Sequence, residues 1–253
     1  VVPLAPSMDH PGPMANCVRD LAIILQVIAG HDPRDPASIE QPVPDYTAAL
    51  NEKRTPPRLA RVRGLFEDKA SSDVLRMMDQ VTDRFRQEGA IVTEISLPAG
   101  FGTVLANHRT VMAVESAAFH GERLRRHPED YLPEIHKLLE EGLACSATDY
   151  DRSKEHQKHL KQDMAACFDG VDAILAPATT EAAPDIGSTG NPAFNSPWSY
   201  TGLPVVSIPA AYDKDNMPLA IQLVGPAWSE PELLAVSAWC EKVLELEANL
   251  PPG

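Results

Sequence analysis

The sequence has few cysteines and no long apolar run, and each shortage excludes a class of protein. Cysteines stand at positions 17, 145, 167 and 240, with no CxxC pair and no spacing typical of a disulfide framework or a zinc site. Each lies in a helix-like stretch, where we expect a buried, small apolar residue in a cytoplasmic protein. The longest apolar run, residues 21–29, is interrupted by Gln26 and is shorter than the ~20 residues that span a membrane. We therefore expect no membrane partner.

Basic residues are also scarce. Asp and Glu outnumber Lys and Arg by 36 to 22, and the formal net charge is −14. Because a negative field repels phosphate groups, we expect no nucleic-acid partner. No glycine cluster follows the pattern of a phosphate-binding loop. With 43% apolar residues, the 253-residue chain can bury a core, and its start, Val-Val-Pro-Leu, resembles the interior of a longer domain rather than a secretory leader.

The hydrophobic pattern alternates between strands and helices, which is typical of an α/β protein. We expect strands at residues 58–66, 91–97 and 171–175, and a hairpin whose strands lie within 198–210 and 217–226 around the polar turn 213–216. Helices are expected from about residue 13 to residue 30, at 72–88, in several pieces across 101–168, and at 230–246. Residues 31–57 and 178–197 are predicted to be connections. The strand–helix–strand order from 58 to 97 favours a parallel pair with a right-handed crossover.

Two groups of polar residues have the residue types of a functional site but a simpler interpretation. His156 and His159 could face one metal ion from a helix, but no carboxylate or third histidine follows at a useful spacing, and nearby lysines favour a solvated basic face. Ser7, Asp9 and His10 are triad residue types, but neighbours in sequence rarely converge on one reacting atom. These patterns predict no metal site and no catalytic residue.

Segments in chain order resemble the amidase signature family, whose members cleave linear amides with a Ser-Ser-Lys triad. They are 3–15 (PLAPSMDHPGPMA), 28–38 (IAGHDPRDPAS), 146–150 (SATDY), 171–178 (VDAILAPA) and 190–226, which holds the loop GNPAFNSPW and the hairpin. The resemblance implies an α/β fold with a mixed β-sheet flanked by helices. It assigns residues 1–253 to the C-terminal portion of a single amidase domain.

The family's catalytic residues have no counterpart in this chain. They are a Lys, a Ser held by a cis peptide bond and a nucleophilic Ser in a Gly-Gly-Ser-Ser type stretch, all upstream of the segment that matches residue 1. We therefore name no catalytic residue and expect this chain alone to be inactive. The resemblance implies no metal and no organic cofactor. It makes the missing N-terminal half of the domain an expected partner and leaves a homodimer open.

The resemblance places the loop before the hairpin beside the acyl-binding site. It therefore implies that Asn195 and Trp198 bind substrate. The alternative interpretation is that Trp198 packs the hairpin edge and that Asn195 caps a turn. Asn16 departs from the family, which usually has Arg at that position.

The leading hypothesis is an amidase that hydrolyses a small carboxamide to a carboxylate and ammonia or an amine, through an acyl-enzyme on Ser. One alternative is the A subunit of the tRNA-dependent glutamine amidotransferase. That subunit carries an Asp before the hairpin for the glutamine ammonium, where this chain has Pro192. The other alternative is a non-catalytic fragment or interaction module. The identity of the amide depends on a pocket that is built jointly with the absent half.

Overall fold

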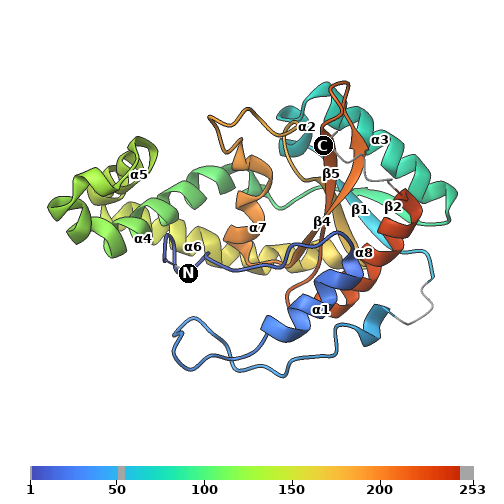
Figure 1. The fold of residues 1–253 in the computed structure, drawn as a ribbon, viewed down its shortest axis with the longest axis horizontal. Helices are drawn as coiled ribbons and strands as arrows, with labels where there is room; N and C mark the ends of the chain where they lie inside the picture. Colours follow the sequence, from blue (N-terminus) through green and yellow to red (C-terminus); the bar gives the residue numbers. More distant parts are fainter. Residues whose placement is uncertain (1, 51–54, 246–253) are drawn as a thin grey trace, which may run out of the picture.

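The structure, a computed structural model, describes residues 2–50 and 55–245 (Figure 1). Its centre is a five-stranded mixed sheet in the order β2-β1-β3-β5-β4. The strands are β1 (Arg58–Val62), β2 (Ile91–Ile95), β3 (Ala173–Pro177), β4 (Val205–Tyr212) and β5 (Pro218–Val224). Helices lie on both faces of the sheet, so the predicted α/β class with a mixed, helix-flanked sheet is confirmed.

The helices divide between two hydrophobic cores. They are α1 (Val18–Ile28), α2 (Leu65–Asp68), α3 (Ser72–Gln87), α4 (Val104–Arg126), α5 (Pro133–Ala144), α6 (Ala147–Asp163), α7 (Ser196–Thr201) and α8 (Glu230–Leu244). Helices α1, α3 and α8 form one core with the sheet, whereas α2, α4, α6 and α7 form the other on the opposite face. The far parts of α4 and α6, together with α5, extend away from the sheet (Figure 1). Short 3₁₀ turns lie at Ala48–Leu50, Ala99–Thr103, Pro128–Asp130, Met164–Phe168 and Pro192–Phe194.

The strand–helix–strand unit forms as the sequence predicts. Strands β1 and β2 are parallel, with Arg58 opposite Ile91, and β1 also pairs in parallel with β3. The Ser71 hydroxyl caps α3 by accepting from the Val74 amide, and α3 buries the apolar face that its periodicity indicates. Strand β1 ends earlier than expected, at Val62, because Gly64 adopts a φ of 68° and turns the chain into the short helix α2.

The hairpin forms around the predicted turn but begins later than expected. The Asp213 carboxylate accepts from the amides of Asp215 and Met217, which fixes the connection between the antiparallel strands β4 and β5. Residues 196–201, which were assigned partly to a loop and partly to the first strand, form helix α7 instead. Gly202, in the left-handed region with a φ of 68°, ends this helix and turns the chain into the strand.

The starts of α6 and α1 are fixed in different ways. The Ser146 hydroxyl accepts from the Asp149 amide at 3.1 Å, so Ser146 caps α6. The first helix does not start near Pro13 but at Val18, whose amide donates to the Glu241 carboxylate of α8. Residues 11–15 are non-helical, and this leaves them free to line the cavity described below.

Close packing of α4 on α5 depends on one glycine. A Cβ at Gly142 would lie 2.0 Å from the carbonyl oxygen of Ala113. Only glycine permits this approach of the two helices.

All four cysteines are unpaired. Cys240 is buried as expected, and burial raises the pKa of its thiol. The other three cysteines are only partly buried, so the expectation that they are core residues was wrong. Within residues 2–50 and 55–245, no helix has the length and apolar character to cross a membrane.

Candidate functional site

A cavity of about 620 Å³ opens beside β4, between the sheet and the N-terminal segment 10–15. Its walls come from that segment, from α1, from α7 with the turn that follows it, and from the starts of β4 and α8. The side chains used in the argument below are Asn195, Trp198, Ser199, Ser207 and Gln222. The cavity is large enough for a small organic ligand.

Asn195 and Trp198, the two predicted substrate-binding residues, both line this cavity. Asn195 is exposed and precedes α7, but its side chain makes no capping hydrogen bond. The local cap belongs to Asn191, whose side-chain oxygen accepts from the Ala193 amide. The Asn195 amide group is therefore available to a ligand, and substrate binding by this residue stays a prediction.

Trp198 contributes mainly to the core behind the cavity wall. Its side chain is only 2% exposed and stacks on Phe66, with ring centroids 5.7 Å apart and planes 7° apart. Phe101 packs against it from another direction. The buried indole Nε1–H has no hydrogen-bond partner among the described residues. These contacts give Trp198 a packing role, with Phe66 and Phe101 rather than with the hairpin edge, and contact with substrate stays a prediction for Trp198 too.

Helix α7 is held in place by α6 through Tyr200. The Tyr200 hydroxyl donates to the Ser153 carbonyl at 2.6 Å, and the Gln157 side-chain amide donates to the Tyr200 carbonyl at 2.9 Å. Burial raises the pKa of Tyr200, so the hydroxyl stays protonated and keeps donating. His156 lies 3.0 Å from the same hydroxyl.

The sequence suggested that His156 lies on a solvated basic face, and the structure shows that this interpretation was wrong. Its Nδ1 faces Tyr200, and its Nε2 lies 2.9 Å from the carbonyl oxygen of Gly100, so the ring joins α6 to two other segments. His159 is exposed and points toward Glu155. No group of three metal-ligating side chains occurs in the described part of the chain, so the two histidines form no such centre.

Gln222 anchors the loop that leads to α7, a role that sequence reasoning missed. Its side chain is almost completely buried in β5, and its Nε2 donates to the carbonyls of Pro177 and Phe194, each at 2.9 Å. The two bonds tie the end of β3 and the turn before Asn195 to the sheet. A single amide in an otherwise apolar strand is the signal that could have predicted this role.

Side chains of α4 and α6 fix the segment that leads into the N-terminal wall of the cavity. Glu115 of α4 accepts from the Ser7 amide at 2.9 Å and from the Ser7 hydroxyl at 2.6 Å. Lys154 of α6 donates to the Ser7 hydroxyl and to the Gln157 side-chain oxygen. Gln157 in turn holds Tyr200 of α7. One polar network therefore positions both the segment before residue 10 and the helix that follows Asn195.

Asp9 and His10 have local structural roles and form no triad with Ser7. The Asp9 carboxylate accepts from the amides of Leu4 and Ala5, while His10 Nδ1 lies 2.8 Å from the Met8 carbonyl oxygen. Ser7 is bound to Glu115 instead. The interpretation of these residues as a coincidence of types is consistent with this geometry.

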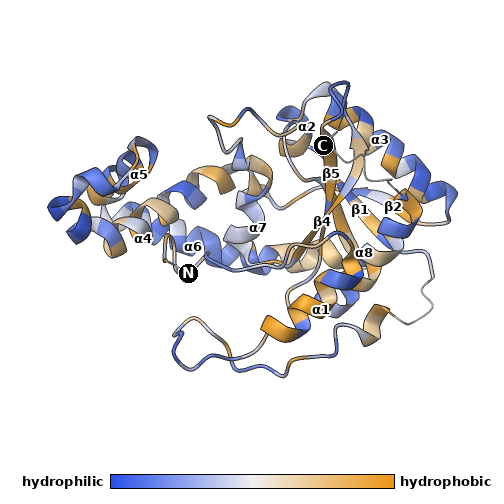
Figure 2. Cartoon of the chain, viewed as in Figure 1, coloured by the Kyte–Doolittle hydropathy of each residue, from blue (hydrophilic) through white to orange (hydrophobic). Residues whose placement is uncertain are grey.

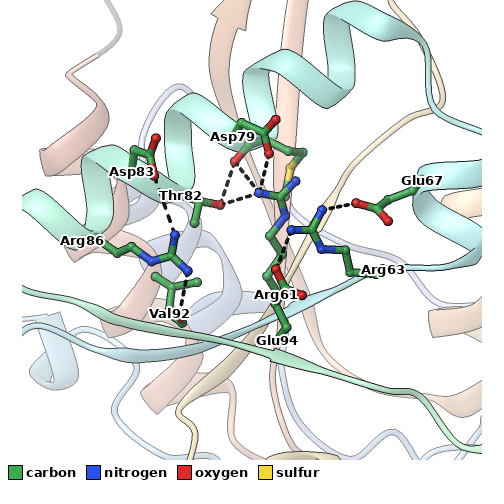
Figure 3. A network of polar contacts seen from close by, with 10 residues as sticks. Arg61, Arg63, Glu67, Asp79, Thr82, Asp83, Arg86, Val92 and Glu94 are labelled. Atoms are coloured by element: carbon green, nitrogen blue, oxygen red, sulfur yellow. Dashed lines mark hydrogen bonds and ion pairs between the residues drawn. The ribbon is translucent and has the colours of Figure 1, made fainter.

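A second polar cluster lies between β1, β2 and α3 (Figure 3). Arg61 of β1 is buried and pairs with Asp79 at 2.7 Å, while its guanidinium also donates to Thr82. Arg63 pairs with Glu67 and Glu94 and holds the pKa of Glu94 below its ordinary value. Each charged group in the pair or triplet has an opposite charge in contact. We assign this cluster a structural role in fastening the parallel half of the sheet.

Known proteins with the same fold identify the family. The family model described as Amidase matches residues 1–234. An amidase from Pseudomonas putida is 29% identical over 225 residues, and the match covers 83% of this chain and 48% of the relative. The A subunit of the Glutamyl-tRNA(Gln) amidotransferase of Methylorubrum extorquens (strain PA1) is 33% identical over 278 residues, covering 95% of this chain and 55% of the relative. The chain therefore belongs to the amidase signature family.

Solved structures agree with this assignment. A crystal structure of an amidase superposes with a TM-score of 0.81 at 26% identity, covering 96% of this chain and 54% of the other. A peptide amidase from Stenotrophomonas maltophilia, 24% identical with a TM-score of 0.77, shows the same fold. The chain spans about half the length of the curated relatives it matches.

Proposed function

We propose that residues 1–253 form the C-terminal portion of a single amidase domain and supply one wall of its substrate cavity. The whole enzyme would hydrolyse a small carboxamide to a carboxylate and ammonia or an amine. The observation that carries this proposal is the coincidence of the family match over residues 1–234 with a cavity at the two residues that the family resemblance marks. A small carboxamide fits the apolar lining and the few polar groups of that cavity.

The proposed division of labour follows from the residues present. The Ser-Ser-Lys triad of the family would come from the complementary half of the domain, which would carry the nucleophile and stabilise the oxyanion. This chain would bind and orient the substrate. The Asn195 side chain offers both a donor and an acceptor, which matches the two ends of a carboxamide group. No metal or cofactor enters the proposal.

Several relatives are A subunits of the glutamyl-tRNA(Gln) amidotransferase, and this keeps that function as the second candidate. Against it, the position expected to hold an Asp for the glutamine ammonium is Pro192. Pro192 begins a 3₁₀ turn, and its ring carries no charge that could pair with an ammonium group. The amidase is therefore the preferred proposal.

We place the protein in the cytoplasm because its four cysteines are unpaired, which suits a reducing compartment.

The test compares this chain alone with the chain plus a complementary half. In the assay, that half is supplied by the part of the Pseudomonas putida amidase outside its match to this chain, produced as a separate polypeptide. Ammonia release is measured on a panel of small carboxamides that includes glutamine. We expect no turnover from the chain alone and turnover from the combination, with Asn195→Ala raising KM more than it lowers kcat.

Asn191→Ala is the matched control, because Asn191 caps the same loop from the other side of the turn. Turnover by the chain alone that survives replacement of every Ser would overturn the amidase proposal. Activity of the combination on glutamine only would favour the amidotransferase function.

A further inference from the structure

A pocket of about 500 Å³, called the Trp228 pocket below, lies beyond the C-terminal end of α1. The candidate substrate cavity meets α1 within the helix, whereas the Trp228 pocket begins at Ala29, where the helix has ended. Its other walls come from the loop 37–46, from Trp228 and from Glu230 at the start of α8. Glu230 is the one lining residue that the two spaces share. The Trp228 pocket is therefore a separate site, and the proposed function does not use it.

Trp228 has a backbone conformation that bulky residues rarely adopt. Its φ is 65°, in the left-handed region, and its side chain is 62% exposed. In the described part of the chain, no aromatic ring stacks on its indole. Neither burial nor ring stacking therefore explains why tryptophan stands where glycine would be unstrained. Strained positions of this kind are concentrated at ligand-binding sites, and here the exposed ring borders a pocket.

Hydrogen bonds fix the loop that forms the other wall of the Trp228 pocket. The Ser38 hydroxyl accepts from the Asp32 amide at 2.9 Å. The Tyr46 amide donates to the side-chain oxygen of Gln26 on α1, also at 2.9 Å. The two prolines of the segment 42–44 restrict the backbone between these anchors. The pocket is therefore largely preformed, which is usual for sites that bind small molecules.

Glu230 is the one charged residue among the described residues that line the Trp228 pocket. Its carboxylate makes no hydrogen bond or ion pair within residues 2–50 and 55–245. Burial and, to a smaller extent, the Glu230 carboxylate raise the pKa of Tyr46, so the two side chains lie near each other and the phenol stays protonated. A cation in the pocket would provide the opposite charge that Glu230 lacks. The net charge of −14 would also favour its approach.

The rest of the lining is mainly apolar, and this indicates which kind of cation fits. Ile39, Val43 and two prolines lie beside the rings of Tyr46 and Trp228. Figure 2 shows that α1, which leads into the pocket, is strongly hydrophobic along much of its length. An unsubstituted ammonium group is strongly hydrated and gains little from such walls. The methyl groups of a quaternary ammonium ion bury apolar surface while the charge is kept, and aromatic faces attract this charge.

We propose that the Trp228 pocket binds a small quaternary ammonium ion of the choline type. The indole of Trp228 would cover one side of the cationic head, and the Glu230 carboxylate would lie beside it. The methyl groups would contact Tyr46 and the apolar side chains of the loop 37–46. The backbone strain at Trp228 is then the conformational cost of presenting the indole to a ligand. The proposal requires no amide hydrolysis, so it stands or falls separately from the proposed function.

The first test titrates this chain with choline and, separately, with the neutral alcohol in which carbon replaces the choline nitrogen. Binding is followed by the indole N–H signal of Trp228 in heteronuclear NMR spectra, and the signal is assigned by its loss in Trp228→Leu. Choline should bind at least about fivefold more tightly than the alcohol, because the aromatic face and the carboxylate both act on the charge. Equal binding of the two compounds, or no saturable shift of the Trp228 signal with choline, would overturn the proposal.

Substitutions then separate the two contributions to binding. Trp228→Leu removes the aromatic face and Glu230→Gln removes the charge, so each should weaken choline binding at least about fivefold. Glu230→Gln should leave binding of the neutral alcohol within about twofold of the wild type. The matched controls are Glu232→Gln, in the same first turn of α8, and Phe119→Leu, an exposed aromatic residue of α4. Unchanged choline binding in a pocket variant, or an equal loss in its control, would contradict the proposed contacts.

A thermal melt distinguishes a ligand-binding role of Trp228 from a packing role. Trp228→Gly relieves the backbone strain, so its melting temperature should be no more than about 2 °C below that of the wild type, while choline binding is lost. A larger fall would assign the side chain to the packing of the fold and count against the proposal.

The last test asks whether another protein surface covers the Trp228 pocket. The choline titration is repeated with the complementary half present, and self-association of the chain is measured by size-exclusion chromatography with and without choline. Choline affinity should stay within about threefold in both cases. Loss of binding when the complementary half is added would make the pocket an internal contact of the domain. A dimer that choline or Trp228→Leu dissociates would make it a contact between two copies, and either result would refute the proposal.

Discussion

Replacing Gln222 with Leu should destabilise the fold because it removes the donor that holds two buried carbonyls together. Gln222 Nε2 donates to the carbonyl oxygens of Pro177 and Phe194, both at 2.9 Å, and these residues lie in the buried part of the protein. An orphaned buried acceptor costs about 1–3 kcal/mol. Since Leu has a similar volume, the packing penalty is small, and we expect a loss of about 3 kcal/mol in the free energy of unfolding.

The assay is urea unfolding followed by circular dichroism, with a thermal melt beside it. A loss of about 3 kcal/mol corresponds to a fall of about 6–12 °C in the melting temperature of a domain of this size. Ser207→Ala is the control, because its hydroxyl lies on the same face and makes only a long, 3.4 Å contact with the Ile221 carbonyl. We expect that control to lose less than about 0.5 kcal/mol. A loss below about 1 kcal/mol for Gln222→Leu would refute the anchoring role.

Three further predictions test other parts of the fold. Tyr200→Phe removes the hydroxyl that donates to the Ser153 carbonyl and should cost about 1–2 kcal/mol in urea unfolding, and no measurable loss would contradict this account of α7. Gly142→Ala places a Cβ 2.0 Å from the Ala113 carbonyl oxygen and should cost at least about 3 kcal/mol and expose α5 to proteolysis, whereas Gly121→Ala, with its Cβ 3.4 Å from Leu143, should be nearly neutral. Arg63 lowers the pKa of Glu94 below its ordinary value of 4.5, so the ion pair stabilises the fold above pH 4.5, and this contribution is lost as the pH falls through the folded pKa. The difference in stability between the wild type and Glu94→Gln should therefore shrink as the pH falls from 4.5 through the folded pKa of Glu94. A difference that stays constant over this pH range would contradict the ion pair.

Elements whose fold is decided by local pattern could be predicted from the sequence. Helix α3 has a regular apolar face and a serine cap, and it ends within a residue of the expected position. The turn at Asp213 has short-range hydrogen bonds that its residue types favour. In both cases the interactions that decide the structure lie within a few residues of one another, so they leave a pattern in the sequence.

Helix α7 was assigned partly to a strand because its residues are compatible with a strand as well as with a helix. Trp198 and Tyr200 are common in strands, and the helix is only six residues long. What stabilises it is distant in sequence: Tyr200 bonds to α6 residues more than 40 positions away. His156 was misjudged for the same reason, since its contacts with Gly100 and Tyr200 involve separations of 56 and 44 residues.

The candidate site also has a part that the sequence predicts and a part that it does not. The position of Asn195 and Trp198 on a common cavity follows from a loop that the family resemblance marks. The scaffold behind them, made by Gln222, Glu115 and Lys154, depends on contacts between distant segments and has no local signature.

The network from Ser7 through Glu115, Lys154 and Gln157 to Tyr200 has a consequence for how this protein could diversify. The segment that leads into the 10–15 wall of the cavity and the helix α7 that forms another wall are attached to the same pair of helices, so their spacing is set outside the cavity itself. A substitution on α4 or α6 that shifts one attachment would alter the width of the cavity without touching any residue that lines it. Changes in ligand size among related proteins should therefore accumulate in these helices as well as in the cavity walls.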